Sequence, residues 1–184
     1  MNTTATTDIA ADSPMRVVLE VFPGARRTLF RKYHVGGCSS CGFEMEETLG
    51  ALCARNGDLP VAEVLAVIQT SHAADQQILI EPATLKEWMA TQPTLRLLDI
   101  RTREEFDAAR IASAIHLTRD VMQEAMARWD PDAPVVILDH KGEQSLDAAA
   151  YFLGHGLRQV RCLRGGMDAW AREVDPAIPR YELA

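Results

Sequence analysis

The sequence has no apolar run approaching the ~18 residues that a helix needs to cross a bilayer, so it predicts no transmembrane segment. It also lacks an excess of positive charge, because the formal net charge is −7 and the pI is about 5.2. Nucleic acids and anionic membrane surfaces bind basic faces, so neither is expected as a partner. Residues 1–13 contain no lysine, no arginine and no long apolar stretch, unlike a signal peptide. We expect them to form the disordered tail of a cytoplasmic protein.

Cysteine is scarce as well, with four in 184 residues. Four thiols in a cytoplasmic chain are not expected to form a disulfide framework. Cys38 and Cys41 form a Cys-x-x-Cys pair, whereas Cys53 and Cys162 lie in apolar patterns that predict burial. Only Cys38 and Cys41 are therefore candidates for chemistry.

The remaining composition is that of an ordinary globular protein, with 47% hydrophobic and 24% charged residues. A chain of this length can hold one medium domain or two small ones. Residues 70–77 are polar and lack periodicity, which predicts a linker. The linker would separate a helical Cys-x-x-Cys domain at residues 14–69 from a second domain at residues 78–184.

Apolar spacing predicts that the first domain is all-helical. Its first helix starts at Pro14 and stops before Pro23, the second covers about 25–33, the third runs from near Cys41 to Ala54, and the fourth follows Pro60. About 55 residues bury only a marginal core. The domain is therefore expected to pack against the second domain or against another chain, as in a homodimer.

The second domain is predicted to belong to the α/β class, because short apolar stretches alternate with helical patterns. The expected strands are 79–80, 95–100, 114–117, 135–138 and 160–163. Such an alternation predicts a doubly wound, parallel five-stranded sheet. Residues 135–138 are apolar throughout, as in a central strand that is covered on both faces.

A polar loop follows this central strand and leads into a helix, with Ser145 as its expected cap. In an open parallel sheet, ligands bind beyond the carboxyl ends of the strands. The loop should therefore direct its backbone N–H groups into a crevice, where they favour an anion. The candidate binding loop comprises Asp139, His140, Lys141, Gly142, Glu143, Gln144 and Ser145.

Four motifs within residues 78–175 resemble those of the rhodanese-like domain family and occur in the family's order. They are Leu97-Leu98-Asp99-Ile100-Arg101 with Glu104-Glu105-Phe106, the stretch 111–116, the strand, loop and helix at 135–145, and Gly165-Gly166-Met167 with Trp170. The resemblance implies the family's α/β fold, with Asp99 and Arg101 bracing the active loop. From the residues alone, these two side chains also fit an ordinary buried ion pair.

In catalytic members of that family the loop runs Cys-x-x-Gly-x-Arg-Ser, and its cysteine carries a persulfide. This chain has Asp139 in place of the cysteine and Gln144 in place of the arginine, while it keeps Gly142 and Ser145. The resemblance therefore implies a loop that has lost its nucleophile.

A carboxylate at the cysteine position has a physical consequence. Asp139 would accept the hydrogen bonds of the loop itself and could carry no sulfane sulfur. Glu143 adds a second negative charge, so an incoming thiosulfate or phosphate would be repelled unless His140 and Lys141 point inward. A mechanism in which the aspartate acts as nucleophile or base is the alternative.

The helical domain is similar to a second family, the small helical domains described as hybrid-cluster-associated redox disulfide domains. The residues that carry this resemblance are Val18-Leu19-Glu20, Pro23, the stretch 29–33, Gly37-Cys38-Ser39-Ser40-Cys41 and Glu47-Thr48-Leu49. The resemblance implies a reversible dithiol formed by Cys38 and Cys41.

The surrounding residues give a separate reason for reactive thiols. Cys38 and Cys41 flank the expected start of the third helix, whose free N–H groups supply positive potential. Arg31, Lys32 and His34 lie just upstream, and both effects lower a thiol pKa from its usual ~8.5. Two alternatives remain open. The cysteines could face solvent without a task, or a symmetric dimer could pool two such pairs into a zinc or iron–sulfur site.

The favoured hypothesis is a thiol redox or sulfur-carrier accessory protein that acts through Cys38 and Cys41 on a partner protein of sulfur or redox metabolism. The rhodanese-like part would then be a docking or regulatory module without catalytic activity. The alternatives are a metal or iron–sulfur binding protein that uses the same cysteines, and a binding module with no chemistry. An active sulfurtransferase is least favoured, because the loop nucleophile is absent.

Overall fold

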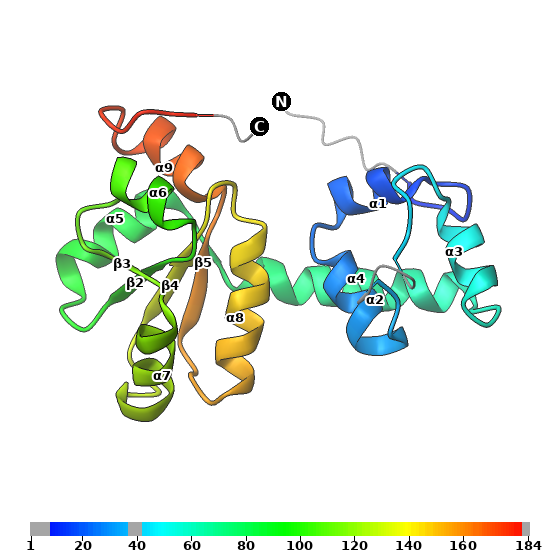
Figure 1. Cartoon of the computed structure of the whole chain (residues 1–184), viewed down its shortest axis with the longest axis horizontal. Helices are drawn as coiled ribbons and strands as arrows, with labels where there is room; N and C mark the ends of the chain where they lie inside the picture. Colours follow the sequence, from blue (N-terminus) through cyan, green and yellow to red (C-terminus); the bar gives the residue numbers. More distant parts are fainter. Residues whose placement is uncertain (1–7, 37–41, 182–184) are drawn as a thin grey trace. The chain divides into compact units, whose positions relative to one another are not determined.

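The computed structural model describes residues 8–36 and 42–181. Contacts divide the chain into two compact units, Met1–Gln77 and Ile78–Ala184 (Figure 1). The described part of the first unit is helical, and the second unit contains a five-stranded parallel sheet with helices. The expected fold class is therefore confirmed. Among the described residues, no helix is both long and apolar enough to cross a membrane.

The first unit, here called the helical unit, packs four helices around one apolar core in its described residues. The helices are α1 (Met15–Val21), α2 (Ala25–Tyr33), α3 (Leu49–Arg55) and α4 (Val61–Gln77). Each helix contributes a side chain that is at most 1% exposed, namely Val18, Leu29, Leu52 and Ile68. These side chains lie on the apolar faces that helical spacing predicts.

The third helix begins at Leu49 and not near Cys41, so the prediction of its start is wrong. The hydroxyl of Thr48 accepts a hydrogen bond of 3.2 Å from the N–H of Ala51 and caps the helix at this point. Thr48 also forms an antiparallel bridge with Pro14. Because Thr48 is extended in this bridge, the helix cannot continue through it toward Cys41.

Residues 70–77, expected to be a linker, are the last turns of α4 instead. They contain no proline or glycine, so nothing in their sequence ends the helix. Within them Asp75 is buried, and both of its carboxylate oxygens accept hydrogen bonds of 2.6 Å from the guanidinium of Arg27 on α2. This buried pair holds a polar stretch in a helix that its local sequence does not predict.

Part of the expected disordered tail belongs to the fold. Ile9 is 6% exposed and lies in the core of the helical unit. The carbonyl oxygen of Ala11 accepts a hydrogen bond of 2.7 Å from the N–H of Gly50, in the first turn of α3. The bond satisfies a donor that every helix start leaves free. Residues 8–13 are therefore ordered, while residues 1–7 lie outside the described part of the chain.

We expect Ile9→Ala to destabilise the helical unit by about 2 kcal/mol, the lower end of the range for such truncations, because Ile9 lies at the edge of the core. Asp12→Ala is the matched control, since Asp12 is exposed in the same segment. Hydrogen–deuterium exchange at the Gly50 N–H should accelerate in the first variant only. Equal protection in both variants would show that Ile9 does not anchor this segment.

The second unit, here called the sheet unit, is built on one sheet in which every strand pair is parallel. The strand order is β1-β5-β4-β2-β3. The strands are β1 (Leu79–Ile80), β2 (Arg96–Asp99), β3 (Ala114–His116), β4 (Val135–Leu138) and β5 (Val160–Leu163). The helices are α5 (Pro82–Thr91), α6 (Arg103–Ala108), α7 (Arg119–Arg128), α8 (Gln144–Gly154) and α9 (Gly166–Glu173). The middle strand β4 is buried throughout, as its apolar run predicts.

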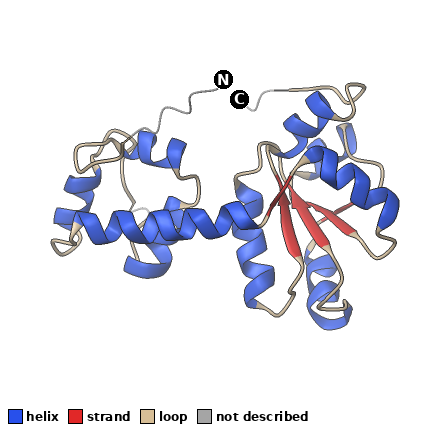
Figure 2. Cartoon of the chain, turned by 180° about the vertical axis from the view of Figure 1, so that it is seen from behind, coloured by secondary structure: helices blue, strands red, loops and turns tan. Residues whose placement is uncertain are grey.

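Helices cover both faces of this sheet, which Figure 2 shows as the central layer of the unit. Successive side chains of β4 point to opposite faces, as in any strand. Val135 and Ile137 pack with residues of α7 and α8, whereas Val136 and Leu138 pack with residues of α5 and α9. The doubly wound architecture follows from these two separate clusters.

The direction in which the chain crosses the sheet reverses between β2 and β4. From β2 the chain moves outward to β3, and from β4 it moves outward to β5 on the opposite side. Ligands in open α/β sheets bind at such a switch point, beyond the carboxyl ends of the strands. The segments that follow Asp99 and Leu138 therefore lie where a ligand site is expected.

Candidate functional site

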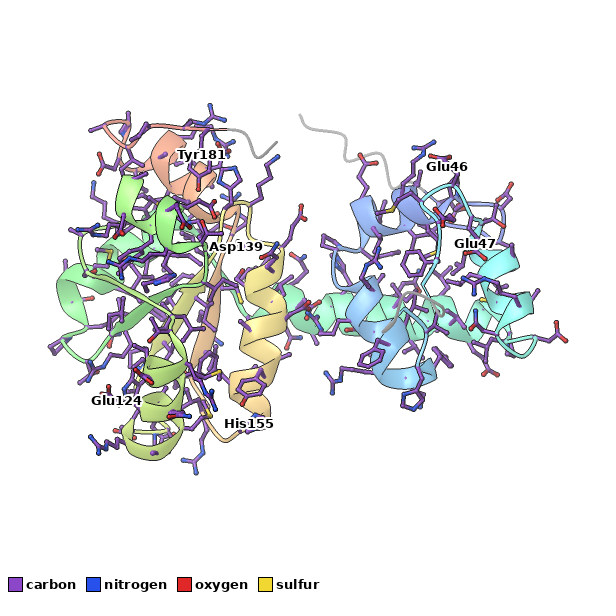
Figure 3. All side chains as sticks on the ribbon, viewed as in Figure 1. Glu46, Glu47, Glu124, Asp139, His155 and Tyr181 are labelled. Atoms are coloured by element: carbon purple, nitrogen blue, oxygen red, sulfur yellow. The ribbon has the colours of Figure 1, made fainter. Side chains whose placement is uncertain are left out.

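A pocket of about 430 Å³ lies at this switch point. Figure 3 labels Asp139, which follows β4 at this end of the sheet. The residues that line the pocket are Ile100, Arg101, Thr102, Glu105, Asp139, His140, Lys141, Glu143 and Gln144. The structure thus brings Arg101 together with every member of the predicted binding loop except Gly142 and Ser145.

The carboxylate of Asp139 fills the nest of N–H groups that its own loop forms. Its Oδ2 atom accepts hydrogen bonds from the N–H groups of Glu143, Gln144 and Ser145 at 3.1, 2.6 and 3.2 Å. Its Oδ1 atom accepts a hydrogen bond from the N–H of Gly142. Asp139 is only 4% exposed, so these bonds replace the hydration that the carboxylate has lost. The carboxylate occupies the place where an external anion was expected.

The expected role of Ser145 as a helix cap is wrong. α8 begins at Gln144, so Ser145 lies inside the first turn, where it is fully buried. Its hydroxyl has no hydrogen-bond partner among the described residues. Asp139 binds the first N–H groups of α8 instead, because a carboxylate placed just after β4 reaches several of them at once.

The shape of the loop depends on Gly142, whose φ of +85° lies in the region that favours glycine. A Cβ atom at this position would approach the backbone nitrogen of Gly165 to 2.8 Å and the carbonyl oxygen of Leu163 to 2.9 Å. The carbonyl oxygen of Asp139 also accepts a hydrogen bond of 2.8 Å from the N–H of Met167, at the start of α9. The loop is therefore held against the end of β5 and the beginning of α9.

The described pocket lining contains two cations, Arg101 and Lys141, and three carboxylates. Lys141 is exposed and lines the pocket. His140 lines it too, but His140 is 6% exposed, and neither ring nitrogen has a hydrogen-bond partner in the described part of the chain. The carboxylates of Glu105, Asp139 and Glu143 belong to the same lining.

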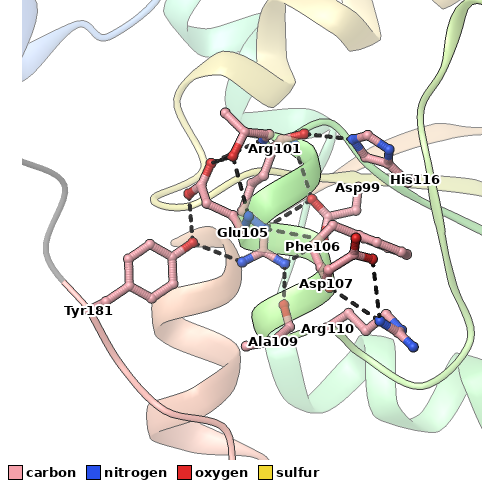
Figure 4. A network of polar contacts seen from close by, with 10 residues as sticks. Asp99, Arg101, Glu105, Phe106, Asp107, Ala109, Arg110, His116 and Tyr181 are labelled. Atoms are coloured by element: carbon pink, nitrogen blue, oxygen red, sulfur yellow. Dashed lines mark hydrogen bonds and ion pairs between the residues drawn. The ribbon is translucent and has the colours of Figure 1, made fainter.

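Asp99 and Arg101 form a buried ion pair at the end of β2 (Figure 4). Their side chains are 0% and 1% exposed, and Nη2 of Arg101 lies 2.6 Å from Oδ2 of Asp99. Burial acts to lower the pKa of Arg101, but the hydrogen bonds and the charge of Asp99 outweigh it and raise the pKa. Nη2 also donates to the carbonyl oxygen of Ala109 at 2.6 Å. The pair therefore ties β2 to the end of α6.

Sequence reasoning assigned no site role to Tyr181 or to Glu105, although Glu105 stands in one of the family motifs. The hydroxyl of Tyr181 accepts a hydrogen bond of 2.8 Å from Nη1 of Arg101 and donates one of 2.6 Å to Oε1 of Glu105. The Tyr181 ring packs on the ring of His140, with 4.4 Å between the centroids. No local pattern marks Tyr181, but Glu105 stands at capping-box spacing from Thr102 and forms that box.

The pKa shifts of Tyr181 and Glu105 agree with the direction of the hydrogen bond between them, in which the phenol donates to the carboxylate. Burial raises the pKa of the Tyr181 phenol, and the hydrogen bond to Glu105 adds to the rise. Burial acts to raise the pKa of Glu105 as well, but the hydrogen bonds from Tyr181 and Thr102 outweigh it and lower the pKa. At neutral pH the phenol is therefore a neutral donor and Glu105 a charged acceptor.

Cys38 and Cys41 lie outside the described residues, so their expected chemistry rests on the sequence. The helix that was expected to begin beside them begins at Leu49, which removes a helix N-terminus from the reasons for a low thiol pKa. Cys53 and Cys162 are buried, as expected, and burial raises the pKa of the Cys53 thiol. In the described ranges, no cluster of three His, Cys, Asp or Glu side chains could hold a metal ion.

We expect Asp99→Asn to destabilise the sheet unit by about 3–5 kcal/mol, because it leaves the Arg101 charge buried without its partner. Asp107→Asn is the matched control, since Asp107 pairs with Arg103 at 2.7 Å on the surface. The control should lose less than about 1 kcal/mol. All tryptophans of the chain lie in the sheet unit, so urea unfolding followed by tryptophan fluorescence measures both variants. Equal losses would show that the buried pair does not hold this unit.

The sequence model of the rhodanese-like domain family matches residues 81–173, about half of the chain. A rhodanese-related protein from Thermoplasma volcanium is 22% identical over 55% of this chain and 97% of that one, with a TM-score of 0.45. The Alr3790 protein from Anabaena sp. is 22% identical over 50% and 74%, with a TM-score of 0.47. The human single domain sulfurtransferase TSTD1 is 20% identical over 52% and 96%, with a TM-score of 0.45. The chain belongs to the rhodanese-like domain family.

Proposed function

We propose that the protein is an accessory factor of thiol or sulfur chemistry whose rhodanese-like domain does not itself carry a persulfide. In this proposal the domain is a docking or regulatory module, and Cys38 and Cys41 exchange electrons or sulfur with a partner protein. The observation that carries the proposal is the Asp139 carboxylate, which accepts hydrogen bonds from four successive N–H groups of the loop.

The chemistry of a carboxylate supports an inactive loop. Transfer from thiosulfate needs a polarizable nucleophile that can hold a sulfur atom, which a thiolate is and a carboxylate is not. The N–H groups that would stabilise a bound anion already serve Asp139. Two like charges ~4 Å apart interact by ~4 kcal/mol at an effective dielectric of ~20, so the carboxylates in the pocket also oppose an incoming anion.

The positive charge of Arg101 does not make the pocket attractive to an anion. Its guanidinium is paired with Asp99 and hydrogen-bonded to Tyr181, so its positive charge is already matched inside the unit. Lys141 is the other cation of the described pocket lining, which also contains the carboxylates of Glu105 and Glu143. A neutral or cationic ligand suits this pocket better than a small dianion.

The support for chemistry at Cys38 and Cys41 comes from their spacing and their neighbours. The last turn of α2 carries Arg31 and Lys32, and these cations favour a thiolate nearby in the sequence. Cys53 is buried, with a raised pKa, and so offers no competing nucleophile. The proposed pair can hold a disulfide, a persulfide or, through two chains, a zinc or iron–sulfur site.

The first test is a thiosulfate:cyanide sulfurtransferase assay. We expect no turnover above background from the natural chain and little from Asp139→Cys, because the loop still has Gln144 in place of the family's arginine. Adding Gln144→Arg to Asp139→Cys should raise turnover by at least roughly tenfold, which corresponds to ~1.4 kcal/mol. Asp139→Ser is the matched control, since it removes the carboxylate without adding a sulfur nucleophile. Steady turnover by the natural chain, retained after Cys38→Ser and Cys41→Ser, would refute an inactive loop.

The second test maps alkylation of the folded, reduced protein near pH 7 by mass spectrometry. We expect Cys38 or Cys41 to react faster than a free cysteine, while Cys53 and Cys162 react only on unfolding. Oxidation should join Cys38 to Cys41 in one chain. Slow and equal labelling of both would reject the redox proposal, and protection that only a chelator removes would support a metal site instead.

A further inference from the structure

The groups around the Tyr181 phenol form a cradle that the function proposed above leaves unused. Nη1 of Arg101 donates to the hydroxyl oxygen at 2.8 Å, and Oε1 of Glu105 accepts from the hydroxyl at 2.6 Å. The ring of His140 supplies an aromatic platform, tilted by 32° against the Tyr181 ring. Figure 4 shows the phenol between Arg101 and Glu105, with the tyrosine reaching them from the C-terminal segment.

The cradle is held in place without help from Tyr181. The Asp99 carboxylate binds Nε and Nη2 of Arg101, and the carbonyl oxygen of Ala109 binds Nη2 as well. The other carboxylate oxygen of Glu105, Oε2, accepts hydrogen bonds from the N–H and the hydroxyl of Thr102 at 3.0 and 2.9 Å. A donor and an acceptor fixed in this way are preorganised for a ligand.

The chemistry of the cradle selects a phenol. A hydroxyl group can accept from Arg101 and donate to Glu105 at the same time, which an ionised carboxylate cannot do because it has no proton to donate. The negative charge of Glu105 opposes an anion at this point. The platform of His140 favours an aromatic ring, since ring pairs at such distances attract each other.

The segment that delivers Tyr181 is attached through Val174 and Ile178, which pack against the apolar cluster of α5 and α9, and through an ion pair of 2.7 Å between Arg180 and Asp168. After α9 ends at Glu173, residues 174–181 have no regular structure, and residues 175–177, 179 and 180 are exposed. Tyr181 itself is partly buried against the cradle. His140 meanwhile keeps two buried ring nitrogens without a hydrogen-bond partner in the described part of the chain, so the Tyr181 segment leaves part of the site unsatisfied. A competing segment that bonds to His140 would gain a contact that the chain's own segment lacks.

We propose that Arg101, Glu105 and His140 form a binding site for a tyrosine side chain, which Tyr181 fills in the same chain and which a tyrosine of a partner protein can take over. This inference rests on the docking role proposed above and identifies the site at which the partner protein docks. Its test reads tyrosine binding and neither sulfur transfer nor thiol oxidation, so the two proposals can fail separately.

The experiment uses the full-length chain with Tyr181→Ala, which empties the cradle. N-acetyl-L-tyrosinamide is the probe, and N-acetyl-L-phenylalaninamide, which lacks the hydroxyl, is the matched control ligand. NMR signals of the Arg101 guanidinium and the His140 ring report binding. We expect saturable shifts with the tyrosine probe, and affinity weaker by at least roughly tenfold both for the phenylalanine probe and for the natural chain, in which Tyr181 competes.

The acceptor is tested by adding Glu105→Gln to Tyr181→Ala, because glutamine preserves the capping box but not the charge. The proposal expects a further loss of affinity for the tyrosine probe. Equal affinity for both probes, or no shift at Arg101 and His140 in the folded variant, would overturn it. If Tyr181→Ala does not fold, Tyr181→Phe keeps the ring and lacks the hydroxyl. The tyrosine probe should then bind more tightly than to the natural chain, and failure to do so would also overturn the proposal.

Discussion

The sheet unit depends on how one loop satisfies four backbone N–H groups that converge after β4. Such a nest concentrates positive potential and needs a negative group close to it. In this chain the negative group is the Asp139 carboxylate, which is fixed to the middle strand of the sheet and is almost fully buried. The loop therefore keeps its conformation without an external ligand, and its N–H groups are already bound. The same bonds cap α8, so the occupied nest and the start of that helix are one structural feature.

A second internal arrangement completes the pocket beside the nest. Asp99 matches the charge of Arg101, and the phenol of Tyr181 connects that guanidinium to Glu105. Internal partners thus satisfy most of the polar groups at the switch point. His116, His140 and Ser145 are the exceptions here among the described residues, each with at least one buried polar atom that has no partner. In the function proposed above, this pocket holds a segment of protein and does not activate a small dianion.

Much of the sheet unit could be predicted from its sequence, because buried strands leave a plain signal. The apolar run of β4 was expected to be a central strand, and all four of its residues are buried. The helical unit was less predictable at its boundaries. The bridge between Thr48 and Pro14 makes α3 begin later than its apolar pattern indicates. The ion pair between Asp75 and Arg27 stabilises the last turns of α4, which the polar sequence does not predict. Both effects come from residues far away in the sequence, which local periodicity cannot register.

In the site, too, the residues marked by local sequence patterns could be predicted, and those placed by distant contacts could not. Asp139, the loop around it and the pair Asp99–Arg101 were accessible from strand ends and motif spacing. Tyr181 was not, because its contact with Arg101 joins residues 80 positions apart through a segment without regular structure. Ser145 was assigned as the cap because serine favours that position, but α8 begins at Gln144, and Asp139 binds its first N–H groups with a charged oxygen.

The central claim is that the carboxylate of Asp139 occupies the anion nest, and NMR titration of the backbone N–H groups of residues 142–145 with sulfate tests it most directly. The account predicts that these signals stay in place in the natural chain, whereas in Asp139→Ala they shift saturably because the emptied nest accepts the anion. Saturable shifts of the same signals in the natural chain would contradict the account, since they would show that the nest is open to an external anion.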